Sequence, residues 1–299
     1  MPLVRCGFVA VCGKPNAGKS RLVNTFVGQS VSIVTPKAQT TRNRITAIRN
    51  DDDAQVIFMD TPGLVKSTQV MNEYLDKIAR RTAGEADVIL FVVDCSTGKN
   101  DPVDLEFLKA TGCPVLLALN KIDLAQDKSV LLPLINKYAE SGVFKEIFPI
   151  SAKSGEGIEQ LYSMIVSLLP EQERLFPADW WSDMPEKFFA AEIIRGSVFM
   201  NLREELPYSS AVEIEVFDEA KREGGLVKIT ASIHVERNSQ KGMVIGKGGE
   251  MLKKIGTRAR EDLEKFLGTR VYLELNVKIT KNWTKNPNEM KKLGYFERK

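Results

Sequence analysis

Residues 13–20 read G-x-x-x-x-G-K-S, a spacing typical of loops that bind phosphate groups. An apolar run precedes them and a segment with helical periodicity follows, which is the context that such a loop requires. Lys19 would neutralise the terminal phosphates of a nucleotide, and the Ser20 hydroxyl would bind Mg²⁺. Glycine leaves room for backbone N–H groups to approach a phosphate chain closely. The residues expected to contribute these groups are Gly13, Asn16, Ala17 and Gly18.

A second polar motif, Asp60-Thr61-Pro62-Gly63, directly follows the apolar run 56–59. The Asp60 carboxylate can hold Mg²⁺ through a water molecule, next to the hydroxyl of Ser20. Gly63 can present its backbone N–H to a terminal phosphate without steric cost. The motif therefore predicts the part of the site that senses the last phosphate of the nucleotide.

Two further motifs would recognise the base. Asp123, in the sequence Asn-Lys-Ile-Asp after the run 115–119, can accept hydrogen bonds from guanine N1–H and the exocyclic amine, a donor pair that adenine lacks. Asn120 and the stem of Lys121 would support and cover the base. After the run 147–150 comes a Ser-Ala-Lys sequence in which the Ala152 N–H can reach guanine O6. The residues of this last motif are Ser151, Ala152 and Lys153.

These motifs need a scaffold that brings strand ends together. Short apolar runs alternate with helix-length segments over residues 5–169, which predicts an α/β domain with a doubly wound parallel sheet. In such sheets, ligands bind at the carboxyl ends of the strands, where all of the motifs above lie. The run 46–49 is expected to form an antiparallel hairpin with 56–59. The expected parallel strands are 8–11, 56–59, 88–93, 115–119 and 147–150.

The order of the motifs resembles the translation-factor-related GTPases, and this resemblance implies GTP and GDP as ligands. In that family a threonine ahead of Asp60 closes over Mg²⁺ and the γ-phosphate and releases after hydrolysis. The polar segment 34–44 suits this role, with Thr41 as the expected residue and Thr40 as the alternative. A second mobile segment is expected from Asp60 to about Asn72. The residues expected to switch are Gln39, Thr40, Thr41, Asp60, Thr61, Pro62, Gly63 and Leu64.

Two positions refine the expected chemistry. Leu64 occupies the place where many small GTPases have the glutamine that orients the attacking water, so the resemblance implies slow unassisted hydrolysis. Asn16 resembles the asparagine that binds a potassium ion beside the phosphates in related GTPases. The alternative for Asn16 is a structural role, capping the loop with its side chain.

Residues beyond 170 differ in composition. The stretch 171–187 follows Pro170 and contains Pro177 and Pro185, together with acidic residues and Trp180-Trp181. It is expected to link two domains. A helix is expected at 188–205, and an antiparallel strand pair at 211–217 and 226–235. Val-Ile-Gly-Lys-Gly-Gly at 244–249, ahead of a helix 250–267 and a strand 271–279, resembles the G-x-x-G signature of KH domains.

The resemblance to KH domains implies binding of single-stranded RNA. Two open glycines let the loop backbone press against the RNA, while apolar side chains shape a groove for about four bases. The element order suits the bacterial (type II-like) arrangement of an α+β KH domain. The residues expected to contact RNA are Lys241, Ile245, Gly246, Lys247, Gly248, Gly249 and Lys253. Aromatic residues of the tail, Trp283 and Tyr295, would either stack on the ligand or dock the C-terminus.

Bulk composition agrees with an intracellular protein that has a polyanionic partner. Residues 235–299 contain 16 Lys and Arg against 8 Asp and Glu, although the whole chain carries a net charge of only +3. Four cysteines without a C-x-x-C pair are expected to stay reduced. No apolar run approaches the ~18 residues of a membrane span, and the start of the chain leaves no room for a signal peptide.

A GTPase fused to a C-terminal KH domain is a narrow combination, and the whole chain resembles the Era family of bacterial ribosome-assembly GTPases. The segments 207–209, 237–241 and 292–295 share in this resemblance. It implies a GTPase domain at 1–170, a linker at 171–187 and a KH domain at 188–299. It also implies binding to the 3′ end of 16S rRNA and to the 30S subunit precursor, with GTP and GDP controlling engagement and release. We expect a cytoplasmic monomer that binds no DNA, with weak association to the inner membrane surface left open.

Three alternatives remain at this level. Leu64 permits an RNA-binding module in which GTP is only structural. The phosphate loop alone would also suit a nucleotide kinase or a metabolic ATPase, although Asp123 argues for guanine. The Gly246 loop could serve a protein partner in place of RNA.

Overall fold

The computed structural model describes residues 2–64, 69–96, 105–125, 129 and 131–295. The chain divides into two compact units, one formed by Met1–Thr68 and Asn72–Asp183 and the other by Met184–Lys299 with Gln69–Met71. Residues 65–68 of the expected second mobile segment lie outside the described residues.

The first unit is built on a seven-stranded sheet in the order β2-β3-β1-β4-β5-β6, with β7 added beside β1. Strands β1, β3, β4, β5 and β6 run parallel, while β2 pairs antiparallel with β3 and β7 pairs antiparallel with β1. The predicted parallel sheet and the β2–β3 hairpin are therefore confirmed. The strands are β1 (Val4–Gly13), β2 (Ile45–Asn50), β3 (Ala54–Asp60), β4 (Val88–Asp94), β5 (Val115–Asn120), β6 (Glu146–Ile150) and β7 (Glu171–Gln172).

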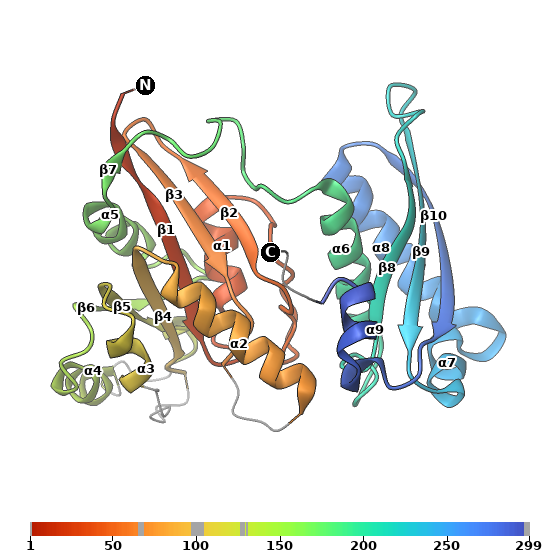
Figure 1. Cartoon of the computed structure of the whole chain (residues 1–299), viewed down its shortest axis with the longest axis horizontal. Helices are drawn as coiled ribbons and strands as arrows, with labels where there is room; N and C mark the ends of the chain where they lie inside the picture. The colour runs from red at the N-terminus through yellow and green to blue at the C-terminus, as the bar shows by residue number, and fades with distance from the viewer. Residues whose placement is uncertain (1, 65–68, 97–104, 126–128, 130, 296–299) are drawn as a thin grey trace. The chain divides into compact units, whose positions relative to one another are not determined.

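Helices cover both faces of this sheet, with α2 in front of it and α1 behind it in Figure 1. Every residue of β3 and of β5 is buried, as expected for central strands that are covered on two sides. The alternation of strand and helix in the sequence thus follows from two apolar layers closing over one sheet. The helices are α1 (Lys19–Val27), α2 (Val70–Gly84), α3 (Leu105–Ala110), the 3₁₀ turn η1 (Ile122–Leu124), α4 (Leu131–Glu140) and α5 (Ile158–Leu168).

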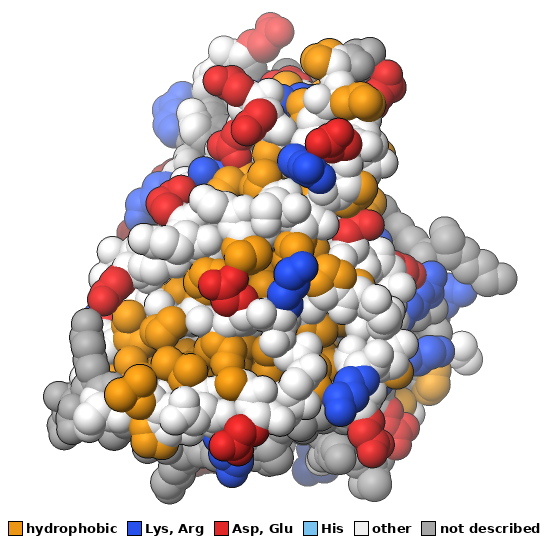
Figure 2. All heavy atoms as spheres, turned by 90° about the vertical axis from the view of Figure 1, so that its left-hand side faces the viewer, with side chains coloured by type: hydrophobic (Ala, Val, Ile, Leu, Met, Phe, Trp, Pro, Cys, Tyr) orange, Lys and Arg blue, Asp and Glu red, His pale blue; other side chains and the backbone are white. Residues whose placement is uncertain are grey.

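The two edges of the sheet are protected differently. At the β2 edge the Ile48 N–H donates to the Trp181 carbonyl at 2.9 Å, and the Ser182 hydroxyl donates to the Thr46 carbonyl at 2.5 Å. At the β6 edge, Pro149 removes one N–H donor, which limits pairing with another strand. Figure 2 views the side of the unit that carries β6, α4 and α5, where apolar side chains are interspersed with a few charges.

The stretch 171–187, expected to be a linker, makes specific contacts within the first unit up to Asp183. Gln55 in β3 accepts hydrogen bonds from the backbone N–H groups of Leu175 at 2.8 Å and Phe176 at 3.0 Å. The Arg174 guanidinium donates to the Asp51 carbonyl at 2.7 Å. The two bonds to Gln55 satisfy backbone N–H groups of a part of this stretch that forms neither helix nor strand.

The second unit has a three-stranded sheet in the order β10-β9-β8, with β8 antiparallel and β10 parallel to β9. The predicted order of helices and strands is confirmed, although the first helix ends at Asn201 because Leu202 adopts extended backbone. The elements are α6 (Glu186–Asn201), β8 (Ala211–Asp218), β9 (Leu226–Val235), α7 (Asn238–Ile245), η3 (Lys247–Gly249), α8 (Glu250–Leu267), β10 (Arg270–Ile279), η4 (Trp283–Lys285) and α9 (Pro287–Lys292).

Strand β9 shows how the second core forms. Its alternate residues Val227, Ile229, Ala231, Ile233 and Val235 are fully buried and join one apolar cluster with α6 and α8. Because successive side chains of a strand point to opposite faces, the helices must cover this one face of the sheet. Figure 1 shows α6 and α8 on the same side of β8, β9 and β10.

The C-terminal tail is docked against the second unit. Trp283 is fully buried, donates its ring N–H to the Ser209 carbonyl at 2.9 Å, and stacks on Tyr295 with ring centroids 5.3 Å apart. Of the two roles considered for these aromatics, the structure therefore supports docking. Across the described parts of the chain, every helix is too short or too polar to span a bilayer. The four cysteines form no disulfide, and the described residues contain no cluster of three or more His, Cys, Asp or Glu placed to hold a metal ion.

Candidate nucleotide site and nucleic-acid interface

The phosphate loop joins β1 to α1 through two glycines that no other residue could replace. Gly13 has φ 141°, and a Cβ there would lie 2.2 Å from the Val92 carbonyl oxygen. Gly18 has φ 97°, and a Cβ there would lie 2.2 Å from the Asn120 amide nitrogen. Positive φ and close backbone approach both demand glycine. The loop is therefore wedged between β4 and the end of β5, with the N-terminus of α1 opening directly from it.

The side chain of Lys19 folds back over this loop. Its ammonium donates to the carbonyls of Gly13 at 3.0 Å and Lys14 at 2.9 Å, and the residue is buried. Burial lowers the pKa of Lys19, and the nearby Asp60 carboxylate opposes that shift. A buried cation at a helix N-terminus is well placed to exchange these carbonyls for phosphate oxygens.

Ser20, Thr41 and Asp60 come together from three different segments. The Ser20 hydroxyl donates to Asp60 Oδ2 at 2.7 Å and lies 2.8 Å from the Thr41 hydroxyl, which itself lies 3.4 Å from the same carboxylate oxygen. Asp60 is fully buried, and its other oxygen, Oδ1, has no hydrogen-bond partner among the described residues. Burial raises the pKa of Asp60, while Ser20 and Lys19 oppose that shift.

This donor set suits a magnesium ion. Mg²⁺ prefers hydroxyl, carboxylate and water oxygens, and a buried carboxylate with an unpaired oxygen is the kind of group that a cation would satisfy. The expectation that Thr41 rather than Thr40 faces the metal agrees with this geometry. The Thr40 hydroxyl donates to the Lys37 carbonyl at 2.8 Å and lies 2.6 Å from the Thr35 hydroxyl, so it stabilises its own loop.

Other residues that are expected to switch also contact their surroundings. Gln39 has φ 56° and donates its amide to Asn72 at 3.0 Å. The amide of Asn16, which is exposed, donates to the Pro36 carbonyl at 3.4 Å, so the phosphate loop touches the segment 34–44 directly. Thr61 is buried and donates to the Val11 carbonyl at 2.8 Å.

The Asp60-Thr61-Pro62-Gly63 motif lies against the phosphate loop. A Cβ on Gly63 would lie 2.5 Å from the Pro15 nitrogen, so only glycine fits after Pro62. The Leu64 N–H donates to the Gly13 carbonyl at 3.1 Å, and its side chain packs on the apolar core. An aliphatic side chain turned toward the core has no polar group to orient a water molecule, as expected from its type.

Asn120 connects three parts of the base site. Its amide donates to the Ala17 carbonyl at 2.8 Å, and its Oδ1 accepts the Ala152 N–H at 2.9 Å. Its backbone carbonyl accepts the Cys95 N–H at 3.0 Å. The phosphate loop and the two base-recognition loops are thereby held in one frame. Because Asn120 already engages the Ala152 N–H, a contact from that group to guanine O6 would share the donor.

Asp123 lies three residues after Asn120, at the surface of the site. It is exposed, and its Oδ1 accepts a hydrogen bond from the fully buried Ser151 hydroxyl at 2.7 Å, which fixes the carboxylate for a ligand. The neighbouring Lys153 is exposed. The site thus presents an exposed carboxylate that is held in position by a buried hydroxyl.

Asp94, at the end of β4, was missed by the sequence reasoning. The Lys121 ammonium lies 2.5 Å from Asp94 Oδ2, which holds the lysine stem in place. Burial would raise the pKa of Asp94, but hydrogen bonds from Lys121 and Ser96 outweigh it and lower that pKa. Its position at the carboxyl end of a predicted parallel strand was the signal that could have identified it.

The G-x-x-G loop of the second unit follows α7 and starts α8. Gly246 has φ 74°, and a Cβ there would lie 2.8 Å from the Met251 Cβ, whereas Gly248 and Gly249, also at positive φ, face open space. Lys247 is exposed beside them. One glycine is therefore required by the fold, and two leave the loop backbone open to a ligand. Of the other residues expected at RNA, Lys253 is exposed, and Lys241 and Ile245 are half-buried.

These features define a class of protein: a phosphate-loop GTPase domain followed by a KH domain. Comparison with known families agrees with both halves. Residues 8–121 match the family described as "50S ribosome-binding GTPase", and residues 205–284 match the KH domain family.

Full-length relatives identify the family. The chain is 46% identical to GTPase Era of Syntrophus aciditrophicus over 300 residues, covering 99% of this chain and 96% of that protein. It is 44% identical to GTPase Era of Geobacter metallireducens over 293 residues, with 97% and 98% covered. The chain belongs to the Era family of GTPases.

Solved structures agree. A variant of Era from Aquifex aeolicus bound to GDP.AlF4⁻ superposes with a TM-score of 0.93 at 41% identity, covering 98% of this chain and 99% of that one. Era in complex with MgGDPNP and nucleotides 1506–1542 of 16S ribosomal RNA matches with the same TM-score, identity and coverage.

Proposed function

We propose that this chain is a GTP-hydrolysing switch that binds the 3′ end of 16S rRNA and assists assembly of the 30S subunit. The observation that carries the proposal is the meeting of Ser20, Thr41 and Asp60 beside the phosphate loop, in a chain that also presents an open G-x-x-G loop. The first feature can sense a terminal phosphate and the second can hold unpaired RNA. The solved relative with a GTP analogue and an rRNA segment supports joining the two.

In this proposal residues 1–170 bind and hydrolyse GTP, residues 188–299 bind RNA, and residues 171–187 join them. Ser20 and Thr41 would bind Mg²⁺ directly and Asp60 through water, since a buried carboxylate oxygen is left unpaired there. The ion would supply charge neutralisation between the β- and γ-phosphates. Lys19, Gly63 and the loop N–H groups would hold the phosphates, and Asp123 would select guanine.

Switching would come from the segment 34–44, which carries Thr41. With GTP, Thr41 would be held at the metal and the γ-phosphate; after hydrolysis one of its partners leaves, and the segment loses that anchor. Asn16 would transmit the change, because its amide reaches the Pro36 carbonyl within the same segment. Leu64 provides no polar group for the attacking water, so hydrolysis would be slow until RNA or a bound potassium ion assists it.

The partners follow from the same chemistry. The excess of basic residues after Val235 favours a polyanion, and the G-x-x-G loop favours single-stranded RNA over duplex DNA. The family supports the 30S precursor as the assembly on which the protein acts and the cytoplasm as its location. We further propose that it acts as a monomer, with at most weak attachment of its basic surface to the inner membrane.

The test measures coupling in both directions. Affinity for an oligoribonucleotide of the 16S rRNA 3′ end is determined with GDP and with a non-hydrolysable GTP analogue, and multiple-turnover phosphate release is measured with and without that RNA. We expect tighter binding with the analogue and faster release with RNA. If RNA affinity were the same with GDP and with the analogue, and the rate of phosphate release were the same with and without RNA, the two domains would be independent modules in which GTP is only structural. The Lys19→Ala variant, which should lose nucleotide affinity, serves as the control.

A further inference from the structure

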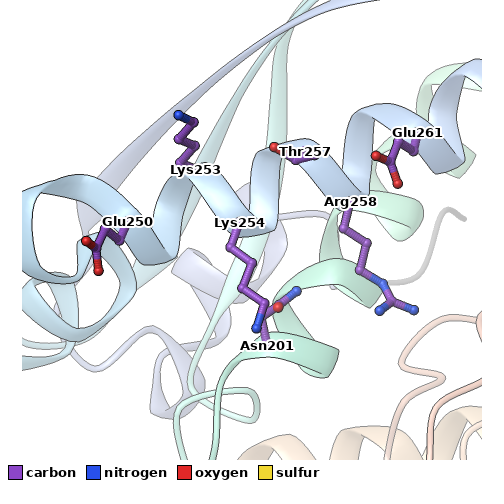
Figure 3. Close-up of a pocket in the computed structure, with 7 residues that line it drawn as sticks. All are labelled: Asn201, Glu250, Lys253, Lys254, Thr257, Arg258 and Glu261. Atoms are coloured by element: carbon purple, nitrogen blue, oxygen red, sulfur yellow. The ribbon is translucent and has the colours of Figure 1, made fainter.

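A hollow of about 510 Å³ lies beside the G-x-x-G loop, between the first half of α8 and the end of α6. Figure 3 shows Lys254 and Arg258 projecting from α8 on the side of Asn201, whereas Lys253 projects on the opposite side of the helix. Glu250 and Glu261 mark the two ends of the hollow along α8, so its middle is cationic.

Of the three cations that line the hollow, the two that project on the side of Asn201 have little compensation from the protein. Lys254 and Arg258 are four residues apart, and like charges at this spacing on a helix repel each other. Among the described residues, no carboxylate lies within ion-pair distance of Lys254, and Arg258 has only Asp262 at 4.0 Å, the limit of an ion pair. Farther along the helix, by contrast, Arg260 is paired with Glu264 at 3.2 Å.

We propose that this hollow binds phosphates of the RNA strand that continues beyond the G-x-x-G loop. The proposal rests on the RNA-binding function given above and extends its footprint. Lys254 lies about 7.5 Å along α8 from Gly249, and Arg258 about 6 Å farther, since each helical residue rises ~1.5 Å. These steps are similar to the spacing of neighbouring phosphates in a nucleic-acid strand. The Asn201 amide adds a polar group from a second helix.

RNA is favoured as the occupant for two reasons. The hollow reaches Glu250, the first residue of α8, which directly follows Gly248 and Gly249, where the backbone is open. Among the described residues Lys254 has no carboxylate within ion-pair distance and Arg258 has only a distant one, and cations that are so weakly paired suit a phosphate chain better than an apolar protein segment. Contacts of this kind position a strand without reading its bases.

The test compares two doubly substituted full-length proteins, each bound to a GTP analogue. Lys254→Gln/Arg258→Gln removes the two lining cations that project on the side of Asn201. Lys265→Gln/Lys292→Gln removes two charges from elsewhere in the second unit, where each lysine pairs with a carboxylate on its own helix. Binding of a four-nucleotide and a ten-nucleotide RNA from the 16S rRNA 3′ end is measured over a range of salt concentrations. Thermal unfolding confirms that both variants fold.

Each neutralised phosphate contributes about 0.7 to the slope of log K against log salt for single strands, so the hollow variant should lose about 1.4 from the slope for the longer RNA. The four-nucleotide RNA, which fills only the groove, should bind as it does to the unsubstituted protein, and the control variant should keep the slope for both RNAs. An unchanged slope for the longer RNA, or an equal loss for both lengths, would overturn the hollow as a phosphate site. Failure of the unsubstituted protein to bind either RNA would instead contradict the RNA-binding function itself.

Discussion

The hydroxyl of Ser20 lies 2.7 Å from a carboxylate oxygen of Asp60, although 40 positions of sequence separate the two residues. The contact exists because β1 and β3 are neighbours in the sheet, with Val11 opposite Asp60 in the register. The phosphate loop at the end of β1 and the carboxylate at the end of β3 therefore face the same space. A metal ion bound there would lie between Ser20, at the end of the phosphate loop, and Asp60, at the end of β3.

The Thr41 hydroxyl is expected to matter more than that of its neighbour. Thr41→Ala removes a hydroxyl that lies 2.8 Å from Ser20, whereas Thr40→Ala removes one that bonds only within its own loop. We expect Thr41→Ala to raise the Mg²⁺ concentration needed for half-maximal GTP hydrolysis by roughly tenfold or more. Thr40→Ala should shift it much less. The ranking is checked by titrating Mg²⁺ in a phosphate-release assay, and a larger shift in the Thr40 variant would reverse our assignment.

Base selection should depend on Asp123. Replacing it with asparagine removes two charge-assisted hydrogen bonds to guanine, each worth at least about 1.5 kcal/mol, so GTP affinity should fall by ~10²-fold or more. Affinity for XTP should rise, because the asparagine amide can donate to the xanthine oxygen. Calorimetric titration with both nucleotides measures this exchange. Ser151→Ala, which only frees the carboxylate from a 2.7 Å bond, is the control and should weaken GTP binding less.

Asn16 is expected to support stimulation by potassium. Its side chain lies on the exposed rim of the phosphate loop, where its oxygen could bind a monovalent cation beside the phosphates. GTP turnover of the unsubstituted protein should be faster in potassium than in sodium chloride at equal ionic strength, and Asn16→Ala should remove that difference. Equal rates in the two salts before any substitution would favour the purely structural role, in which the amide only bonds to Pro36.

Gly246 and Gly248 of the G-x-x-G loop should respond differently to substitution. Gly248 has φ 60° with open space around it, a conformation that asparagine and aspartate tolerate best among other residues. Gly248→Asp should therefore fold and bind RNA weakly, because its charge faces the phosphates, while the isosteric Gly248→Asn keeps most of the affinity. Gly246→Ala meets Met251 at 2.8 Å and should lower the unfolding temperature. Electrophoretic mobility shifts with RNA and thermal melting separate the two effects.

The chain's one histidine should make its stability depend on mildly acidic pH. Burial lowers the pKa of His234 from its ordinary 6.5, opposed by Glu213 at 3.1 Å, with Thr280, Lys278 and Glu215 also facing the ring. Since the unfolded chain takes up this proton more readily, stability is complete above pH 6.5 and is lost as pH falls through the lower folded pKa.

Denaturant unfolding at pH 7.5 and at pH 5.5 measures this loss, and His234→Gln should abolish the part due to the ring. Glu213→Gln should enlarge the loss, because it removes the carboxylate that favours the protonated ring. A pH dependence that is the same in all three proteins would show that other groups are responsible.

Much of the candidate site could be predicted from the sequence because its chemistry is local. Lys19 and Ser20 follow Gly18, whose backbone has a left-handed conformation. The eight residues of the loop motif therefore suffice to place both side chains beside a phosphate. Asp123 likewise stands at a fixed distance from the end of a strand. Alternating apolar runs and helices fixed the sheet type, since only a covered parallel sheet buries such strands on both faces.

Other features depended on segments far apart in the chain. Choosing between Thr40 and Thr41 required knowing which hydroxyl reaches Asp60. The sequence does not indicate this, because adjacent threonines in a segment without regular structure can point in either direction. The pairing of Lys121 with Asp94 required β4 and β5 to be neighbours in register.

The amino-acid sequence by itself determined which groups could bind phosphate, guanine and RNA, because residue type and short spacing set their chemistry. Only the tertiary structure decided which hydroxyl faces the carboxylate, that Trp283 is buried rather than offered to a ligand, and that Lys254 and Arg258 share a hollow with Asn201. The physical reason is that these relations arise from packing between elements distant in the chain, where side-chain direction and strand register act together.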